Sequence, residues 1–159
     1  MRRAILLAAL LSQAAAAETL SGEVVTVIDG DTLTVADAAK KRHRVRLAGI
    51  DAPQAKQPFG LSSARSLAQL CYRKAAKVEW TQKQRGLLLG QVSCEDKDAN
   101  AEQVRRGMAW VSPKQTTAGS GLYELEAYAR LRKLGLWADE KPTPPWEWRS
   151  TGPFRFFGT

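Results

Sequence analysis

Short stretches in which apolar and polar residues alternate occupy much of the first hundred residues, and longer stretches with apolar residues three and four positions apart follow them. The first pattern is typical of half-buried strands and the second of amphipathic helices. The expected strands are Gly22–Ile28, Thr32–Val35, Arg42–Ile50, Val78–Thr81 and Leu87–Ser93. The expected helices are Phe59–Tyr72, one that begins at Asn100 as N-cap and stops at Gly107, and Tyr123–Leu134.

The order of these elements is three strands, a helix, two strands and two helices. Five short strands interrupted by one helix predict an α+β, mainly β fold, a small Greek-key barrel that carries helices. Residues 18–140 are expected to form this domain. Residues 141–159 contain Pro142, Pro144, Pro145, Trp146 and Trp148. They are expected to form a non-helical tail that either packs on the domain or presents its rings.

The segment Arg42–Ile50 has two different faces. Arg44 and Arg46 lie on one face of the expected strand, and Val45 and Leu47 lie on the other. A strand with one basic and one apolar face is typical of a sheet edge or a barrel wall beside a binding groove.

The N-terminal residues 1–17 have the pattern of a secretory signal peptide. Arg2 and Arg3 precede an apolar run, and Ala15-Ala16-Ala17 supplies small residues for cleavage. The run is shorter than the roughly 20 residues of a membrane span, although an uncleaved anchor is the alternative. We expect a secreted or periplasmic protein without a membrane span. Cleavage lowers the formal net charge from +8 to +6, which favours polyanionic partners.

Cys71 and Cys94 are the only cysteines, and in an oxidising compartment an even pair predicts a disulfide. Closing this loop stabilises the fold by roughly 3 kcal/mol in the chain-entropy account.

Two acidic turns, each at the end of an expected strand, are the candidate chemistry. Asp31 and Asp51, with the backbone carbonyl of Ala52 and water, supply the oxygen ligands that suit Ca²⁺. Asp29 is either a further ligand or only a turn residue. Arg46 arrives at the same strand end, and a guanidinium group matches phosphate geometry.

These segments carry a resemblance to a known family. Val27-Ile28-Asp29-Gly30-Asp31-Thr32 and Arg46-Leu47-Ala48-Gly49-Ile50-Asp51-Ala52-Pro53 resemble the staphylococcal nuclease family, as do Asn100, Val104–Trp110 and Gly135-Leu136-Trp137. The resemblance implies a five-stranded oligonucleotide-binding (OB-fold) type barrel with three α-helices. It also implies Ca²⁺-dependent hydrolysis of phosphodiester bonds in DNA and RNA.

The resemblance assigns a role to single positions. Asp31 and Asp51 match the metal-binding aspartates, and Arg46 matches the arginine that holds the scissile phosphate. The general-base glutamate falls on Gln54, and the second arginine falls on Leu87. Glutamine cannot accept a proton, and losing a general base costs ~10²–10⁴ in rate. A missing donor to developing charge costs roughly 10²–10³.

The basic residues around the expected groove are candidates for nucleic-acid contact. Arg44, Arg46 and Arg85 are expected to bind the backbone, and Arg85 would replace the missing second arginine if the loop is shorter than the alignment implies. The cluster Lys40–Arg42 is either part of this strip or simply solvated.

Three functions are compatible with the sequence. The first is a catalytically impaired pseudonuclease that acts by binding nucleic acid or a protein partner. The second is an active Ca²⁺-dependent nuclease, and the third is a protein-interaction module without nucleic-acid affinity. Gln54 and Leu87 favour the first, with Ca²⁺ binding in doubt and a monomer expected.

Overall fold

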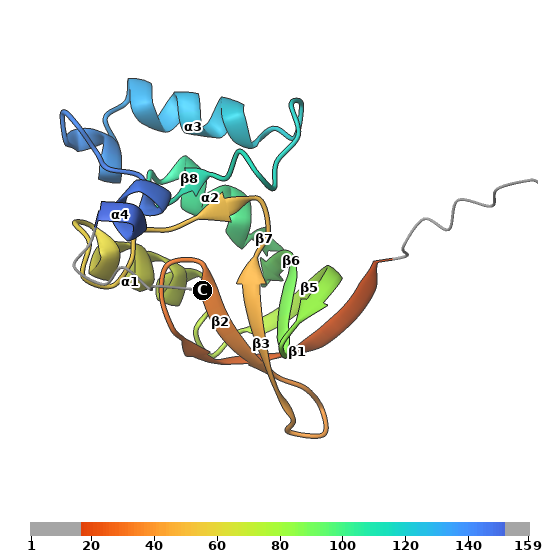
Figure 1. The fold of residues 1–159 in the computed structure, drawn as a ribbon. Helices are drawn as coiled ribbons and strands as arrows, with labels where there is room; N and C mark the ends of the chain where they lie inside the picture. The colour runs from red at the N-terminus through yellow and green to blue at the C-terminus, as the bar shows by residue number, and fades with distance from the viewer. Residues whose placement is uncertain (1–16, 152–159) are drawn as a thin grey trace, which may run out of the picture.

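The computed structural model describes residues 17–151, in which strands form one part of the molecule and helices gather beside them (Figure 1). The strands are β1 (Glu18–Val27), β2 (Thr32–Ala36), β3 (Arg42–Leu47), β4 (Ile50–Asp51), β5 (Ala75–Gln84), β6 (Leu87–Cys94), β7 (Lys97–Asp98) and β8 (Trp110–Val111). The helices are α1 (Gly60–Cys71), α2 (Ala99–Arg105), α3 (Leu122–Leu131), the 3-10 helix η1 (Gly135–Ala138) and α4 (Pro145–Thr151).

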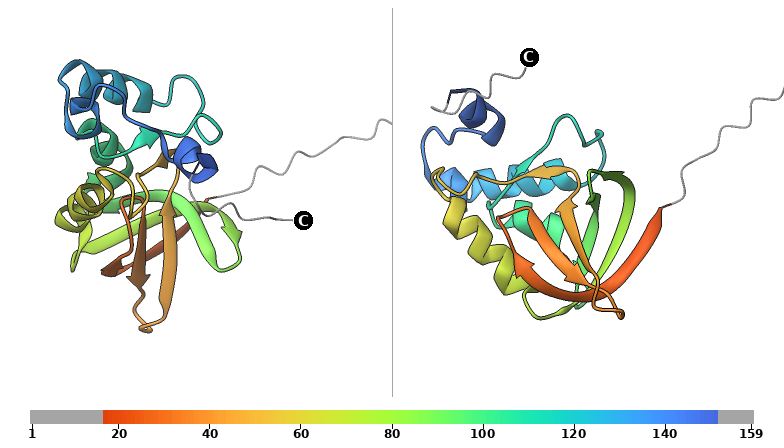
Figure 2. Two further views of the ribbon diagram at one scale, coloured as in Figure 1. Left: turned by 60° about the vertical axis from the view of Figure 1, so that its left-hand side comes forward. Right: turned by 60° about the horizontal axis from the view of Figure 1, so that its bottom comes forward.

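Five of these strands close into a barrel. They run in the order β3-β2-β1-β5-β6, and a parallel pairing of β3 with β6 joins the two edges. The first half of β1 pairs with β5 and its second half with β2, so this one strand bends around the barrel (Figure 2). Closure leaves few unpaired backbone groups at sheet edges, which favours a discrete folded unit. The expected α+β, five-stranded OB-type barrel is therefore confirmed.

Two local predictions need correction. The strand expected over residues 42–50 is interrupted, because β3 ends at Leu47 and Gly49 adopts a positive φ of 76°. The chain resumes as β4, which leaves the barrel and pairs with β8. The tail after residue 141 was predicted to be non-helical, and this is wrong, since Pro145 begins α4. Proline is well suited to the first position of a helix, where its missing N–H costs nothing.

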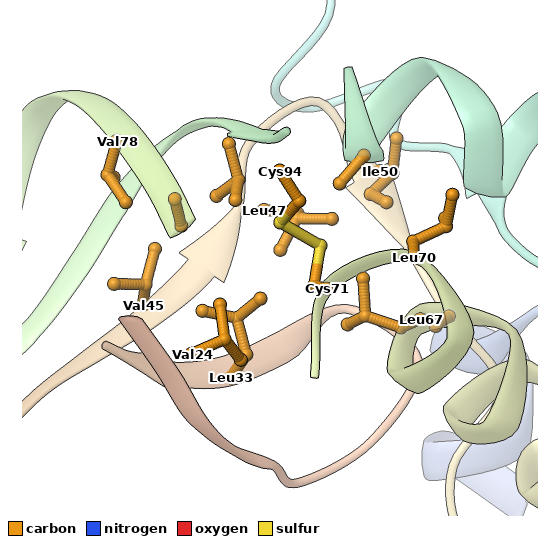
Figure 3. Packing of buried hydrophobic residues seen from close by; sticks show 14 of the residues in the cluster. Val24, Leu33, Val45, Leu47, Ile50, Leu67, Leu70, Cys71, Val78 and Cys94 are labelled. Carbon is orange, nitrogen blue, oxygen red and sulfur yellow. A yellow bond between two sulfur atoms is a disulfide. The ribbon is translucent and has the colours of Figure 1, made fainter. Parts of the chain in front are cut away.

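The core fills the barrel and continues to α1 (Figure 3). Inward-facing residues of the strands, such as Val24, Leu33 and Val45, are fully buried and belong to the same cluster as Leu67 of the helix. The disulfide between Cys71 and Cys94 joins the end of α1 to the end of β6, as predicted. A cross-link at this place ties the helix to the barrel wall through the middle of the core.

A second buried cluster lies under α3. Trp110 and Trp137 meet edge to face with ring centroids 5.6 Å apart, and Ala129 and Leu136 complete the cluster. Both tryptophans are therefore packing residues.

In residues 17–151, no helix has the length and apolar character that crossing a membrane requires. The expected signal peptide lies outside the described residues, apart from Ala17.

Candidate functional site

The two predicted aspartates meet at one end of the barrel. Asp31 lies in the β1–β2 connection directly before β2, and Asp51 is the last residue of β4. Both are almost fully buried. Arg46 of β3 lies between them, with its Nη2 atom 3.1 Å from Asp51 Oδ1 and 3.5 Å from Asp31 Oδ2. The structure thus brings together the three side chains that the sequence singled out, from three separate segments.

Burial dominates the chemistry of Asp31. Its carboxylate accepts hydrogen bonds from the hydroxyl of Thr32 and the backbone N–H of Ala52, each at 2.8 Å. Removal from water nevertheless outweighs the nearby Arg46 guanidinium and these bonds, and it raises the pKa of Asp31 to about 6. The role predicted for Ala52 used its carbonyl oxygen, whereas the contact seen here is made by its N–H.

The turn of residues 29–31 packs against α1 and α2. Gly30 packs against α1, and a Cβ atom at this position would collide with the Ser63 hydroxyl. The buried amide of Gln103 donates to the Gly30 carbonyl at 2.7 Å and to the Ser63 carbonyl at 3.1 Å. A polar group buried without partners is costly, so these bonds restrict where the turn can lie. Asp29 Oδ1 accepts from the Asp31 N–H within the turn.

Asn100 does not cap α2, contrary to the sequence prediction. Asp98 is the cap, and its carboxylate accepts from the Ala101 N–H at 2.9 Å. Asn100 is instead fully buried and bonds to three backbone groups, the Val92 N–H and the carbonyls of Ala48 and Gly90. It thereby fixes the bend between β3 and β4, which leads to Asp51.

An arginine that sequence reasoning missed completes the site. Arg149 of α4 binds Asp51 with both terminal nitrogens, at 2.6 Å between Nη2 and Oδ2 and 3.3 Å between Nη1 and Oδ1. The hydrogen bonds to Asp51 raise the pKa of Arg149, so it stays charged. The available signal was Pro144-Pro145 followed by a helix-compatible stretch, since proline favours the first helical turn.

The segment that carries α4 is attached to the domain at a second point. Gln57, which is buried, donates from Nε2 to the Thr143 carbonyl at 2.5 Å, and its Oε1 atom accepts from the Gln54 N–H at 3.1 Å. Pro145, at the start of α4, is buried as well. Residues 57 and 143 therefore hold the helix so that Arg149 reaches the acidic pair.

The remaining predicted residues lie around this centre. Gln54 lies three residues after Asp51, at the start of a turn in which its carbonyl accepts from the Gln57 N–H, and it is half-buried. Leu87 pairs with Arg44 in the parallel ladder of β3 and β6, so both side chains project from the same face of the sheet. Arg85 sits exposed in the turn between β5 and β6 with a positive φ of 48°. Arg149, rather than Arg85, is the second arginine that contacts Asp51.

The arrangement has consequences for a divalent cation. In residues 17–151, no group of three or more acidic, histidine or cysteine side chains is placed to hold a metal ion. Asp31 and Asp51 are the carboxylates that meet at Arg46, and both oxygens of Asp51 already accept from Arg149. A cation and the Arg149 guanidinium would need the same oxygens. The residues as arranged therefore do not fit Ca²⁺ together with Arg149.

Comparison with known proteins agrees with this architecture. The model of the family described as "Staphylococcal nuclease homologue" matches residues 44–139. An "Uncharacterized endonuclease" of Escherichia coli O157:H7 is 42% identical over 82% of this chain and 85% of its own length. The "Micrococcal nuclease" of Shigella flexneri is 39% identical over 80% of this chain and 79% of its own. "Protein ParB" of Escherichia coli is 36% identical over 94% of this chain and 90% of its own length. With the barrel and its acidic pair, these matches show that the chain belongs to the staphylococcal nuclease family.

Proposed function

We propose that this protein binds the phosphodiester backbone of nucleic acid at the site formed by Asp31, Arg46 and Asp51, and that it has lost measurable hydrolysis of that backbone. The observation that carries the proposal is an unused hydrogen-bond donor on the Arg46 guanidinium group. Its Nε atom is buried and has no hydrogen-bond partner among the described residues. An unpaired buried donor on a guanidinium group is unfavourable, and a phosphate oxygen would satisfy it.

The surroundings of Arg46 support a polyanionic ligand. Arg44 is exposed on the same face of β3, two residues earlier. Arg42 is exposed at the start of that strand, and Lys40 and Lys41 are exposed in the connection before it. Such a basic strip follows a phosphate backbone well and makes binding depend on salt. The family's nuclease activity places nucleic acid first among such ligands.

The proposed loss of catalysis rests on Gln54. Members of the family are generally Ca²⁺-dependent nucleases, and the resemblance assigns Gln54 to the position of the general base. An amide can orient a water molecule but cannot take its proton at neutral pH, and this costs ~10²–10⁴ in rate. Leu87 offers no donor to a developing phosphate charge. The ion pair between Asp51 and Arg149 also lowers the expected rate of hydrolysis, because Arg149 competes with a metal ion for Asp51.

The test combines binding with cleavage. Fluorescence anisotropy of a labelled single-stranded oligonucleotide in chelator should show binding that weakens steeply with salt. Incubation with single- and double-stranded DNA and Ca²⁺ should leave both intact, and an Asp51→Ala variant controls for contaminating nuclease. Absence of binding would overturn the proposal. Cleavage that needs Ca²⁺ and disappears in the variant would overturn its catalytic half.

A second candidate function is a weak Ca²⁺-dependent nuclease. It is favoured by the convergence of Asp31, Arg46 and Asp51 at one point and by the names of the relatives, which include an endonuclease and a micrococcal nuclease. In this case Arg149 would have to leave Asp51 before the metal ion binds. Chelator-sensitive cleavage distinguishes it from the first proposal.

We further propose that the protein works in an oxidising compartment, secreted or periplasmic. The support is the signal-peptide pattern of residues 1–17 together with the Cys71–Cys94 disulfide, because structural disulfides persist outside the reducing cytosol. Fractionation of cells that produce the full chain, followed by N-terminal sequencing of the mature protein, tests this. A reduced, uncleaved protein in the cytosol would contradict it.

A further inference from the structure

Asp51 lies against two guanidinium groups at once. Arg46 reaches its Oδ1 atom from β3, and Arg149 spans both oxygens from α4, 98 residues further along the chain. One arginine would be enough to pair this carboxylate. The second brings a positive charge to a place where Asp31 and Asp51 would otherwise share Arg46 alone.

This charge matters for any anionic ligand of the site. Two carboxylates and one guanidinium group leave an excess of negative charge, and this repels a phosphodiester at short range. Arg149 offsets that excess without a metal ion. Asp29 adds a further acidic group, although it is turned toward the Asp31 N–H. Arg149 thus reduces the repulsion that a phosphate group would meet next to Arg46.

Arg149 also keeps donors available for such a ligand. A guanidinium group has five N–H donors in a planar fork, and Asp51 engages only the two terminal nitrogens on one side. The side chain remains 43% exposed, although its head group is anchored. The bond from Gln57 to the Thr143 carbonyl holds the chain close to the start of α4. An anchored arginine loses little conformational freedom when a phosphate binds.

We propose that Arg149 is the second phosphate-binding residue of this site, acting beside Arg46 and held in place by Asp51. The inference rests on the proposed function and adds a residue to it. The position on β6 at which the resemblance expects an arginine carries Leu87, whose side chain cannot donate a hydrogen bond. In this chain the second cation comes from the C-terminal helix.

The experiment measures the affinity of the mature protein for a fluorescein-labelled single-stranded oligothymidylate, in chelator and over a series of salt concentrations. The variants are Arg149→Ala, Arg46→Ala and, as matched control, Arg105→Ala. Arg105 is also paired with a glutamate, at 2.7 Å, and its side chain is 45% exposed, so its loss removes a comparable ion pair elsewhere. Thermal unfolding of each variant shows whether it is folded.

The expected result is a loss of roughly 10-fold to 100-fold in affinity for Arg149→Ala, as for a charge-assisted hydrogen bond, and little change for Arg105→Ala. The slope of log affinity against log salt should fall by about 0.7 for Arg149→Ala, as for one phosphate contact to a single strand. A residue that merely fastens α4 would change the unfolding temperature and leave this slope unaltered. Arg149→Lys should keep the slope and recover part of the affinity.

The outcomes separate the two proposals. If Arg46→Ala abolishes binding while Arg149→Ala behaves like Arg105→Ala, the inference about Arg149 is overturned and the proposed function stands. If the unmodified protein does not bind, or Arg46→Ala is as harmless as the control, the proposed function itself fails and the inference with it.

Discussion

Asn100 is the side chain whose removal should reveal how the barrel supports the site. It is fully buried and serves three backbone groups, at 3.0 Å from the Val92 nitrogen, 2.8 Å from the Ala48 carbonyl and 3.3 Å from the Gly90 carbonyl. The Gly90 carbonyl also accepts from the Ala48 N–H. Asn100→Ala therefore leaves the buried Val92 N–H and the partly buried Ala48 carbonyl without these bonds.

The size of the effect follows from that count. An unsatisfied buried backbone group costs about 1–3 kcal/mol, and the partly buried Ala48 carbonyl adds less because water can reach it, so the change costs roughly 3 kcal/mol in the free energy of unfolding. This is a large share of the ~5–15 kcal/mol that holds a typical domain. Loss of the N-cap in Asp98→Ala should cost only about 1 kcal/mol. Because Ala48 lies in the bend toward β4, Asn100→Ala should also weaken oligonucleotide binding.

Urea unfolding followed by tryptophan fluorescence measures both variants, since Trp110 and Trp137 are buried and change environment on unfolding. The unmodified protein should have the highest free energy of unfolding, Asp98→Ala a lower one and Asn100→Ala the lowest. If Asp98→Ala were the more damaging change, or if Asn100→Ala cost less than about 1 kcal/mol, the account of Asn100 as a buried bridge would be refuted.

Three further outcomes are expected. Arg149→Ala should raise the affinity for Ca²⁺ in titration calorimetry, because it frees both oxygens of Asp51 and removes a positive charge; an unchanged affinity would show that Arg149 does not compete with the cation. In an Arg149→Ala background, which frees Asp51 for the cation, Gln54→Glu combined with Leu87→Arg should raise Ca²⁺-dependent DNA cleavage by ~10²-fold or more, and no gain would contradict the roles given to these positions. Replacing Cys71 and Cys94 with serine should lower the free energy of unfolding by about 3 kcal/mol in urea titration, whereas equal stability would refute a structural role for the disulfide.

Much of the barrel could be predicted from local pattern. The alternation of Arg44, Val45, Arg46 and Leu47 assigns two faces, and in the structure Val45 and Leu47 are buried while Arg44 is exposed. The apolar spacing of α1 includes Leu67 and Cys71, which are buried, but also Leu61, which is exposed, so it marks the buried side of the helix only in part. These features are set by the period of each element, which depends on neighbouring residues only. The order of the elements and the family resemblance then predicted the barrel, and the pair of cysteines in an expected oxidising compartment predicted the disulfide. The two acidic turns and the strand before the second one supplied Asp31, Asp51 and Arg46, which the fold brings together.

The tertiary structure decided what packs against those faces. Asn100 has the composition of a cap, yet the close approach of β6 and the β3–β4 bend makes it a buried bridge. Arg149 lies in a segment rich in proline and tryptophan, and nothing within that segment specifies Asp51 as its partner. The contact exists because the hydrogen bond between Gln57 and Thr143 holds the chain there and α4 begins at Pro145. Sequence periodicity determines which way a side chain points, and only the fold determines what it meets.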